Sequence, residues 1–139
     1  LLANSTSTLV EGNMRDVYLF VDAVEGEITK LYLSGNNYTL YVPQIIMSEV
    51  LNKPKQVFPV VANWNGREGL AFYFTLPENY ELKPYKVYHI KKNGCMCSYI
   101  PIPKLLTRIV VGQKGRVLVK YSICKDGNNR NVIFLEKAS

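Results

Sequence analysis

The sequence contains little of the chemistry that enzymes use. It has a single histidine, His89, among 139 residues, and this histidine stands in an alternating apolar stretch without an acidic neighbour, which is typical of a structural residue. There is no Ser-His-Asp order, paired-carboxylate cluster, glycine-rich phosphate loop or His-Glu-x-x-His motif, each of which would place the groups that a particular reaction needs. We therefore expect no enzyme, no catalytic residue and no cofactor.

Cysteines are also few, and their spacing does not suit a metal. Cys95-Met96-Cys97 separates two thiols by one residue, whereas structural zinc sites pair them across at least two, and Cys124 adds only one more ligand. The odd number, with no secretory h-region at the start of the sequence, favours a reducing compartment. We predict no metal, free thiols and a cytoplasmic location.

No predominantly apolar run approaches the roughly 20 residues that cross a bilayer, so we expect no membrane span. Because 47% of the residues are hydrophobic and 20% are charged, the chain has enough apolar material for a packed core. Its length suits one domain, or two very small ones. A mainly disordered protein is excluded.

Acidic residues are scarce in the second half of the chain. Residues 1–80 hold five Lys or Arg and eight Asp or Glu, whereas residues 81–139 hold twelve and three, so a basic half lies beside an acidic one. This asymmetry favours a polyanionic partner, either nucleic acid or less often an anionic membrane surface, that the C-terminal half contacts. A basic face that serves only solubility is the alternative.

Apolar residues alternate with a period of two and are rich in Val, Ile, Leu, Tyr and Phe, which predicts a mainly β protein. Turn residues separate the expected strands at Glu25-Gly26, Ser34-Gly35-Asn36-Asn37, Asn65-Gly66, Asn93-Gly94 and Asp126-Gly127. The expected strands cover residues 17–21, 28–33, 38–42, 57–62, 70–75, 87–91, 97–102, 117–123 and 132–135.

One pattern occurs twice along the chain. Residues 38–61 match 98–121 at a constant offset of 60, and Leu70-Ala71-Phe72 matches Val132-Ile133-Phe134 at an offset of 62. Each copy contains a short apolar run that opens on a proline, Pro43 or Pro103, and about two helical turns are expected there. The domain prediction is an N-terminal arm with an extra strand (1–27), a first repeat (28–76), a linker (77–86) and a second repeat (87–139).

The repeated unit resembles the AbrB/MazE/SpoVT swapped-hairpin family of cradle-loop barrels. The second copy carries Asn93-Gly94, Ile102-Pro103-Lys104-Leu105-Leu106 and Gly112-Gln113-Lys114-Gly115-Arg116-Val117 in the order and spacing of that family. The first copy keeps Val42-Pro43-Gln44-Ile45-Ile46 but has Lys53-Pro54-Lys55 in place of the glycine-bearing turn. A unit of this size cannot bury its own apolar face. The resemblance therefore implies a single-chain, pseudo-dimeric swapped-hairpin β-barrel with short helices, and a double-psi barrel is the alternative topology.

The function that the resemblance implies is binding to double-stranded DNA, usually by a transcription regulator. The basic residues of the second copy would neutralise phosphates. Carried over by position, these DNA-binding residues are Lys91, Lys92, Lys104, Arg108, Lys114 and Arg116. The family often has arginine on the helix four positions after the proline, where this chain has Met47 and Thr107, so the resemblance does not extend to base-specific contacts.

The first copy is less basic, with Lys30, Lys53, Lys55 and Arg67 against Glu49 and Glu68. We therefore expect DNA to contact a single basic face that the second copy mainly builds. The alternative function is a protein-interaction or structural module in which the acidic N-terminal arm meets a protein partner. A homodimer is left open. The ten tyrosines suit either cross-strand packing pairs or a stacking surface for single-stranded nucleic acid.

Overall fold

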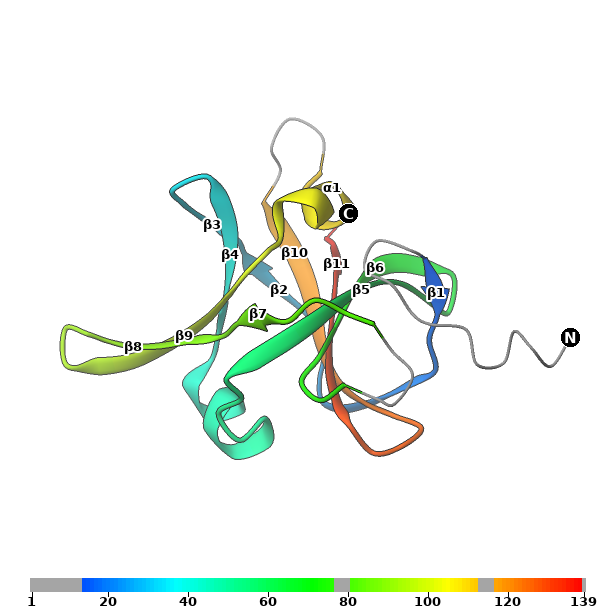
Figure 1. The fold of residues 1–139 in the computed structure, drawn as a ribbon, viewed down its shortest axis with the longest axis horizontal. Helices are drawn as coiled ribbons and strands as arrows, with labels where there is room; N and C mark the ends of the chain where they lie inside the picture. Colours follow the sequence, from blue (N-terminus) through cyan, green and yellow to red (C-terminus); the bar gives the residue numbers. More distant parts are fainter. Residues whose placement is uncertain (1–13, 77–80, 113–116, 139) are drawn as a thin grey trace, which may run out of the picture.

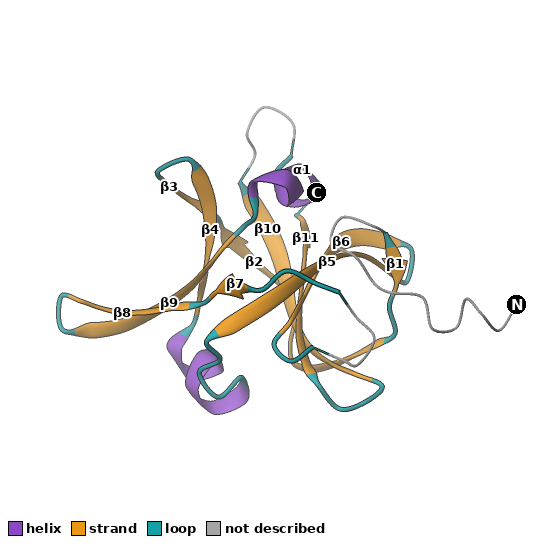
Figure 2. Ribbon diagram, in the orientation of Figure 1, coloured by secondary structure: helices purple, strands orange, loops and turns teal. Residues whose placement is uncertain are grey.

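The computed structural model describes residues 14–76, 81–112 and 117–138, and it is mainly β. Two sheets make up the molecule (Figures 1 and 2). The seven-stranded sheet has the order β1-β5-β6-β11-β10-β2, with β7 paired to β5, and the four-stranded sheet has the order β3-β4-β9-β8. The strands are β1 (Arg15–Asp16), β2 (Leu19–Lys30), β3 (Tyr32–Ser34), β4 (Asn37–Val42), β5 (Gln56–Trp64), β6 (Arg67–Tyr73), β7 (Tyr85–Lys86), β8 (Tyr88–Lys92), β9 (Cys95–Pro101), β10 (Leu118–Asp126) and β11 (Asn131–Lys137).

Short helical segments follow both prolines, as predicted. A single π-helical turn covers Ile46–Val50, after Pro43. A 3-10 turn at Lys104–Leu106 leads directly into α1 (Thr107–Val110), after Pro103. In both copies, therefore, the helical segment lies between a strand of the four-stranded sheet and a strand of the seven-stranded sheet.

Both sheets have a palindromic arrangement of hairpins. In the four-stranded sheet, the hairpins β3–β4 and β8–β9 meet through their second strands, and Leu40 lies opposite Ile100, 60 positions further along the chain. In the other sheet, β5–β6 and β10–β11 also meet through their second strands, with Ala71 opposite Phe134 and Phe72 opposite Ile133. In each sheet, the two strands that meet at the centre are therefore equivalent strands of the two sequence repeats.

Apolar side chains pack on both faces of the seven-stranded sheet, because its strands alternate between two clusters. One cluster, which includes Leu70, Phe72 and Ile133, packs with Leu40 and Ile100 of the four-stranded sheet and with the helical segments. The second cluster, around Trp64 and Phe134, lies on the other face. The inner face of the four-stranded sheet is thus buried, and its outer face is left to solvent.

The predicted closed barrel is wrong. In the part of the chain that the structure describes, β1 and β2 form the two ends of the strand order and do not pair with each other. The two-residue strand β1 pairs in parallel with β5 and continues through Val17 and Tyr18 into β2. The two end strands are therefore linked by the covalent chain at Val17 and Tyr18, and hydrogen bonds between β1 and β2 do not close the sheet.

The turn predicted at Glu25-Gly26 is also wrong. Residues 19–30 form one continuous strand, β2, whose pairing with β10 shifts register between Tyr121 and Cys124. Gly26 has a φ of 60° there, and its N–H donates to Oγ of Ser122 at 2.9 Å. A glycine in the left-handed region accommodates such a bulge without ending the strand.

Candidate functional site

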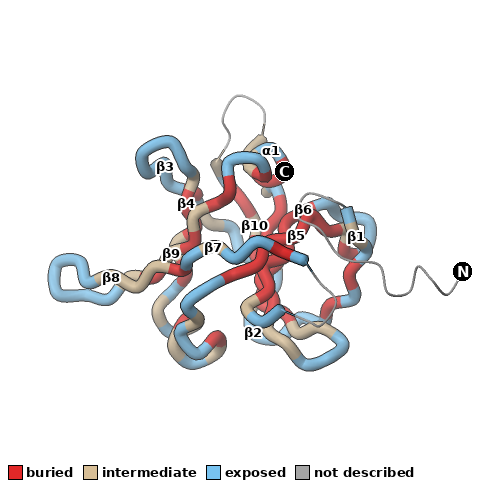
Figure 3. The backbone as a smooth tube through the Cα atoms, viewed as in Figure 1, coloured by how far each residue is buried: buried red, intermediate tan, exposed pale blue. Residues whose placement is uncertain are grey.

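The predicted DNA-binding residues occupy two separate parts of the surface. Lys91 and Lys92 end β8 at the exposed tip of the β8–β9 hairpin, where Asn93 and Gly94 turn the chain with positive φ angles (Figure 3). Lys104 and Arg108 are exposed on the helical segment that contains α1. The other two predicted residues, Lys114 and Arg116, lie outside the described residues.

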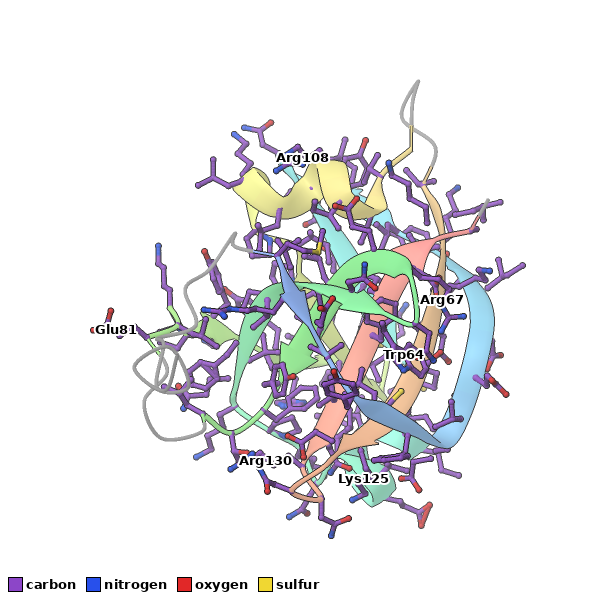
Figure 4. The ribbon with its side chains drawn as sticks, turned by 90° about the vertical axis from the view of Figure 1, so that its right-hand side faces the viewer. Trp64, Arg67, Glu81, Arg108, Lys125 and Arg130 are labelled. Carbon is purple, nitrogen blue, oxygen red and sulfur yellow. The ribbon has the colours of Figure 1, made fainter. Side chains whose placement is uncertain are left out.

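These two groups do not form one cluster. The hairpin tip projects from one side of the molecule and α1 lies at another side (Figure 1). In the perpendicular view, Arg108 lies at the opposite end of the molecule from Lys125 and Arg130 (Figure 4). The positive charge of the second half is therefore distributed over several surfaces.

The absence of acidic residues is a clearer feature than the net charge. Residues 82–125 contain ten Lys or Arg and no Asp or Glu. None of the four strands of the smaller sheet contains an acidic residue. Among the described residues, the salt bridges are Arg67 with Glu136 and Arg130 with Asp126, neither of which involves this sheet.

Four tyrosines form a row across the whole of the smaller sheet, one from each strand. Register places Tyr41 opposite Tyr99, and Tyr99 opposite Tyr88. The Tyr41 and Tyr99 ring centroids are 5.4 Å apart, and those of Tyr88 and Tyr99 are 4.9 Å apart with the planes inclined by only 6°. Tyr32 meets Tyr41 edge-on at 5.5 Å. We call Tyr32, Tyr41, Tyr99 and Tyr88 the tyrosine row.

A lysine lies over the ring at each end of the tyrosine row. Nζ of Lys30 is 5.8 Å from the centroid of Tyr32, and Nζ of Lys86 is 4.9 Å from that of Tyr88. The two ends have the same local sequence, Lys-Leu-Tyr and Lys-Val-Tyr, in which the middle residue, Leu31 or Val87, is buried. Each half of the four-stranded sheet therefore has the same arrangement, a lysine over the outer tyrosine of the row.

The tyrosine row lies on the outer face of the sheet. Leu40 and Ile100, which alternate with row residues along β4 and β9, point to the buried core, so the tyrosines point away from it. Tyr32 is 53% exposed, and the other three rings are partly covered by one another. Desolvation, with smaller contributions from Tyr88 and Tyr41, raises the pKa of Tyr99 above its ordinary value. The Tyr99 phenol therefore stays neutral at physiological pH and acts as a hydrogen-bonding group.

The sequence contains a signal for this surface that the repeat alignment at an offset of 60 does not reveal. The Lys-x-Tyr pair recurs at an offset of 56, not 60, because the second hairpin is four residues longer than the first. Alignment at a fixed offset of 60 pairs Tyr32 with Lys92 and so hides the equivalence of Tyr32 and Tyr88.

Hydrogen bonds of His89 connect the four-stranded sheet to the segment before β5. Its Nε2 donates to the carbonyl oxygen of Pro54 at 2.7 Å, and its Nδ1 lies 2.8 Å from Oγ of Ser98. The Ser98 hydroxyl also lies 3.2 Å from Oε1 of Gln44. With both ring nitrogens engaged and no carboxylate in the network, the arrangement joins segments of both copies.

The described residues contain no group of three or more His, Cys, Asp or Glu side chains close enough to hold a metal ion. Cys95, Cys97 and Cys124 are free thiols, of which Cys95 is exposed and Cys124 is buried. Burial raises the pKa of Cys124 to about 12.

A groove of about 560 Å³ lies beside Trp64 and is lined in part by Arg67. The Arg67 guanidinium lies 4.6 Å above the indole ring, and its Nε lies 3.7 Å from Oε1 of Glu136.

Comparisons of the chain with protein-family models, with curated proteins and with solved structures find no match. Within the described ranges, no helix has the length and apolar character needed to span a membrane.

Proposed function

We propose that the protein is a non-enzymatic DNA-binding protein of the transcription-regulator type. Its basic contacts lie on the β8–β9 hairpin tip and on the Lys104–Val110 segment. Three free thiols suit a reducing compartment such as the cytoplasm.

The observation that carries the proposal is the uninterrupted stretch of 44 residues, 82–125, without a carboxylate. Lys91, Lys92, Lys104 and Arg108 are all exposed, and none is held in a salt bridge with another described residue. Exposed cations that are not engaged in a salt bridge are available to phosphates, and each phosphate neutralised releases counterions into solution. This electrostatic term supplies affinity and leaves sequence specificity to other contacts.

The palindromic strand orders support the proposal that the chain is a pseudo-dimer of two swapped-hairpin-like units. In a pseudo-dimer, equivalent strands meet at a local two-fold axis, which is the relationship that Leu40 and Ile100 have. The two halves are unequal in charge, since β3 ends in Leu33-Ser34 where β8 ends in Lys91-Lys92. DNA therefore contacts the second half more strongly.

The test is a mobility-shift titration of random-sequence duplex DNA at low and at physiological salt. The proposal predicts a shift at low salt that weakens as the salt concentration rises, with a log-log slope of roughly −0.9 for each phosphate contacted. A folded sample that shifts no duplex at low salt would overturn the proposal.

A protein-interaction module is the second candidate, and the outer strand β2 favours it. In the described part of the chain, β2 pairs only with β10, and Phe20 and Ile28 are 64% and 60% exposed on it. Exposed acidic residues Asp22, Glu25 and Glu27 lie on the same strand. An unpaired strand edge with apolar side chains and acidic neighbours suits a basic peptide that adds as a further strand. Loss of partner binding in Phe20→Lys, with DNA binding unchanged, would separate this function from the first.

A further inference from the structure

We infer that the tyrosine row with its two end lysines is a binding site for single-stranded nucleic acid, separate from the basic residues proposed to contact duplex DNA. The inference goes beyond the proposed function, because the residues, the contacts and the form of nucleic acid all differ.

The composition of this face selects a polyanion as the occupant. It presents tyrosines from all four strands, and no Asp or Glu occurs on any of these strands. Lysines stand at both ends of the row, Lys30 over Tyr32 and Lys86 over Tyr88. Aromatic groups between cations are the arrangement by which proteins hold a single strand, whose bases are free to stack and whose phosphates need neutralising.

The two end rings are the stacking positions. The two inner rings, Tyr41 and Tyr99, stack against each other, and Tyr88 covers the second face of Tyr99. Among the described residues, Tyr32 and Tyr88 each meet one tyrosine of the row, and a lysine ammonium lies over each of these two rings. An incoming base therefore has a ring face available at each end of the row once the lysine side chain moves aside.

The lysine need not lose its interaction when it moves. At an exposed site a cation–π contact is weak, whereas base stacking on an aromatic side chain is stronger, and the displaced ammonium gains a phosphate of the same strand. Binding thus exchanges one weak contact for two stronger ones at each end. The four strands span roughly 14 Å from outer strand to outer strand, so a short oligonucleotide reaches both ends.

A duplex fits this face poorly. Its bases are already paired and stacked, so they do not reach Tyr32 or Tyr88, and only the phosphates and the two end lysines would interact. We therefore expect single strands to depend on the aromatic rings and duplexes to depend on Lys91 and Lys92.

The test is a fluorescence-anisotropy titration of the full chain with a labelled oligothymidylate of about 12 nucleotides and with a duplex of the same length. The double variant Tyr32→Leu/Tyr88→Leu keeps apolar bulk at both positions but removes the rings. Tyr18→Leu is the matched control, since Tyr18 is 81% exposed and lies before β2 in the other sheet. Circular dichroism and the thermal midpoint confirm that each variant is folded.

We expect the double variant to bind the single strand about tenfold more weakly or worse, and the duplex within about twofold of the unchanged protein. Tyr18→Leu should match the unchanged protein on both ligands. Lys30→Gln/Lys86→Gln should weaken single-strand binding and reduce its salt dependence, with Lys137→Gln as the control. Should the double tyrosine variant prove unstable, Tyr32→Phe/Tyr88→Phe keeps the rings and is expected to retain most of the single-strand affinity.

Any of three results would overturn the inference. The folded protein could fail to bind the single strand, or Tyr32→Leu/Tyr88→Leu could lose as much affinity for the duplex as for the single strand. In the third case, Tyr18→Leu would lose as much single-strand affinity as the double variant. If the protein binds the single strand but not the duplex, this result overturns the proposed function and leaves the tyrosine-row site supported.

Discussion

Leu40 and Ile100 lie directly opposite each other on neighbouring strands, and both are fully buried. They come from equivalent positions of the two repeats, so the repeats meet at this pair in the centre of the four-stranded sheet. The tyrosine row crosses the opposite face of the same four strands. The position of the row therefore depends on the packing beneath it.

Truncation of either residue of this pair should destabilise the fold to a similar extent. We expect Leu40→Ala and Ile100→Ala each to lower the free energy of unfolding by about 2–4 kcal/mol, through lost burial and a residual cavity. Leu33→Ala, on β3 with an exposed side chain, is the control and should cost little. Urea denaturation measures all three, and a loss under about 1 kcal/mol at both buried positions would contradict the packing described.

Gly69 should not tolerate a side chain. A methyl group there would meet the carbonyl oxygen of Leu135 and lie 2.6 Å from Cζ of Phe134, whose ring packs edge-on against Trp64. We expect Gly69→Ala to destabilise by about 2–3 kcal/mol, because either the backbone of β11 or the Phe134 ring must shift. Gly127→Ala, with no atom within 4 Å of the added carbon, should stay within about 0.5 kcal/mol of the unchanged protein in the same denaturation experiment.

The hydroxyl of Ser98 should matter more than that of an exposed serine. Ser98→Ala removes the partner of Nδ1 of His89 and of Oε1 of Gln44 in a partly buried network. The expected cost is about 1–3 kcal/mol, because the imidazole nitrogen loses its hydrogen bond without regaining water. Ser34→Ala, at the exposed β3–β4 tip, provides the comparison, and identical unfolding midpoints for the two variants would refute a structural role for the network.

The stability of the protein should fall above pH 9 through Cys124. Its pKa is raised from 9.0 to about 12 by burial, so between these values the unfolded chain loses a proton that the folded chain keeps. The stabilisation is fully present below pH 9 and decreases by about 1.4 kcal/mol per pH unit as the pH rises towards 12. Unfolding curves at pH 8 and above pH 9 should show a larger drop for the unchanged protein than for Cys124→Ala, and equal drops would contradict the burial of the thiol.

The period-two patterns and turn residues predicted the strands of both hairpin pairs and the short helical segments, because these elements depend on local sequence. They did not predict β2, since Glu25-Gly26 has the composition of a turn and only pairing with β10 makes it a bulge. The closed barrel was wrong for a similar reason: whether β1 and β2 pair depends on how the chain passes through Val17 and Tyr18. Lys91, Lys92, Lys104 and Arg108 are exposed as expected, but their separation depends on the three-dimensional path of the chain. The tyrosine row required the registers of four strands together.

The most direct test of the central claim compares two charge reversals in duplex-binding titrations. Lys91→Glu/Lys92→Glu changes the tip of the second copy, and Lys53→Glu/Lys55→Glu makes the same charge change in the exposed segment before β5 of the first copy. We predict that the first pair lowers duplex affinity at low salt at least about tenfold and reduces the salt slope by about 2, while the second pair has a much smaller effect. Equal losses in the two double variants would contradict a DNA interface built mainly from the second copy.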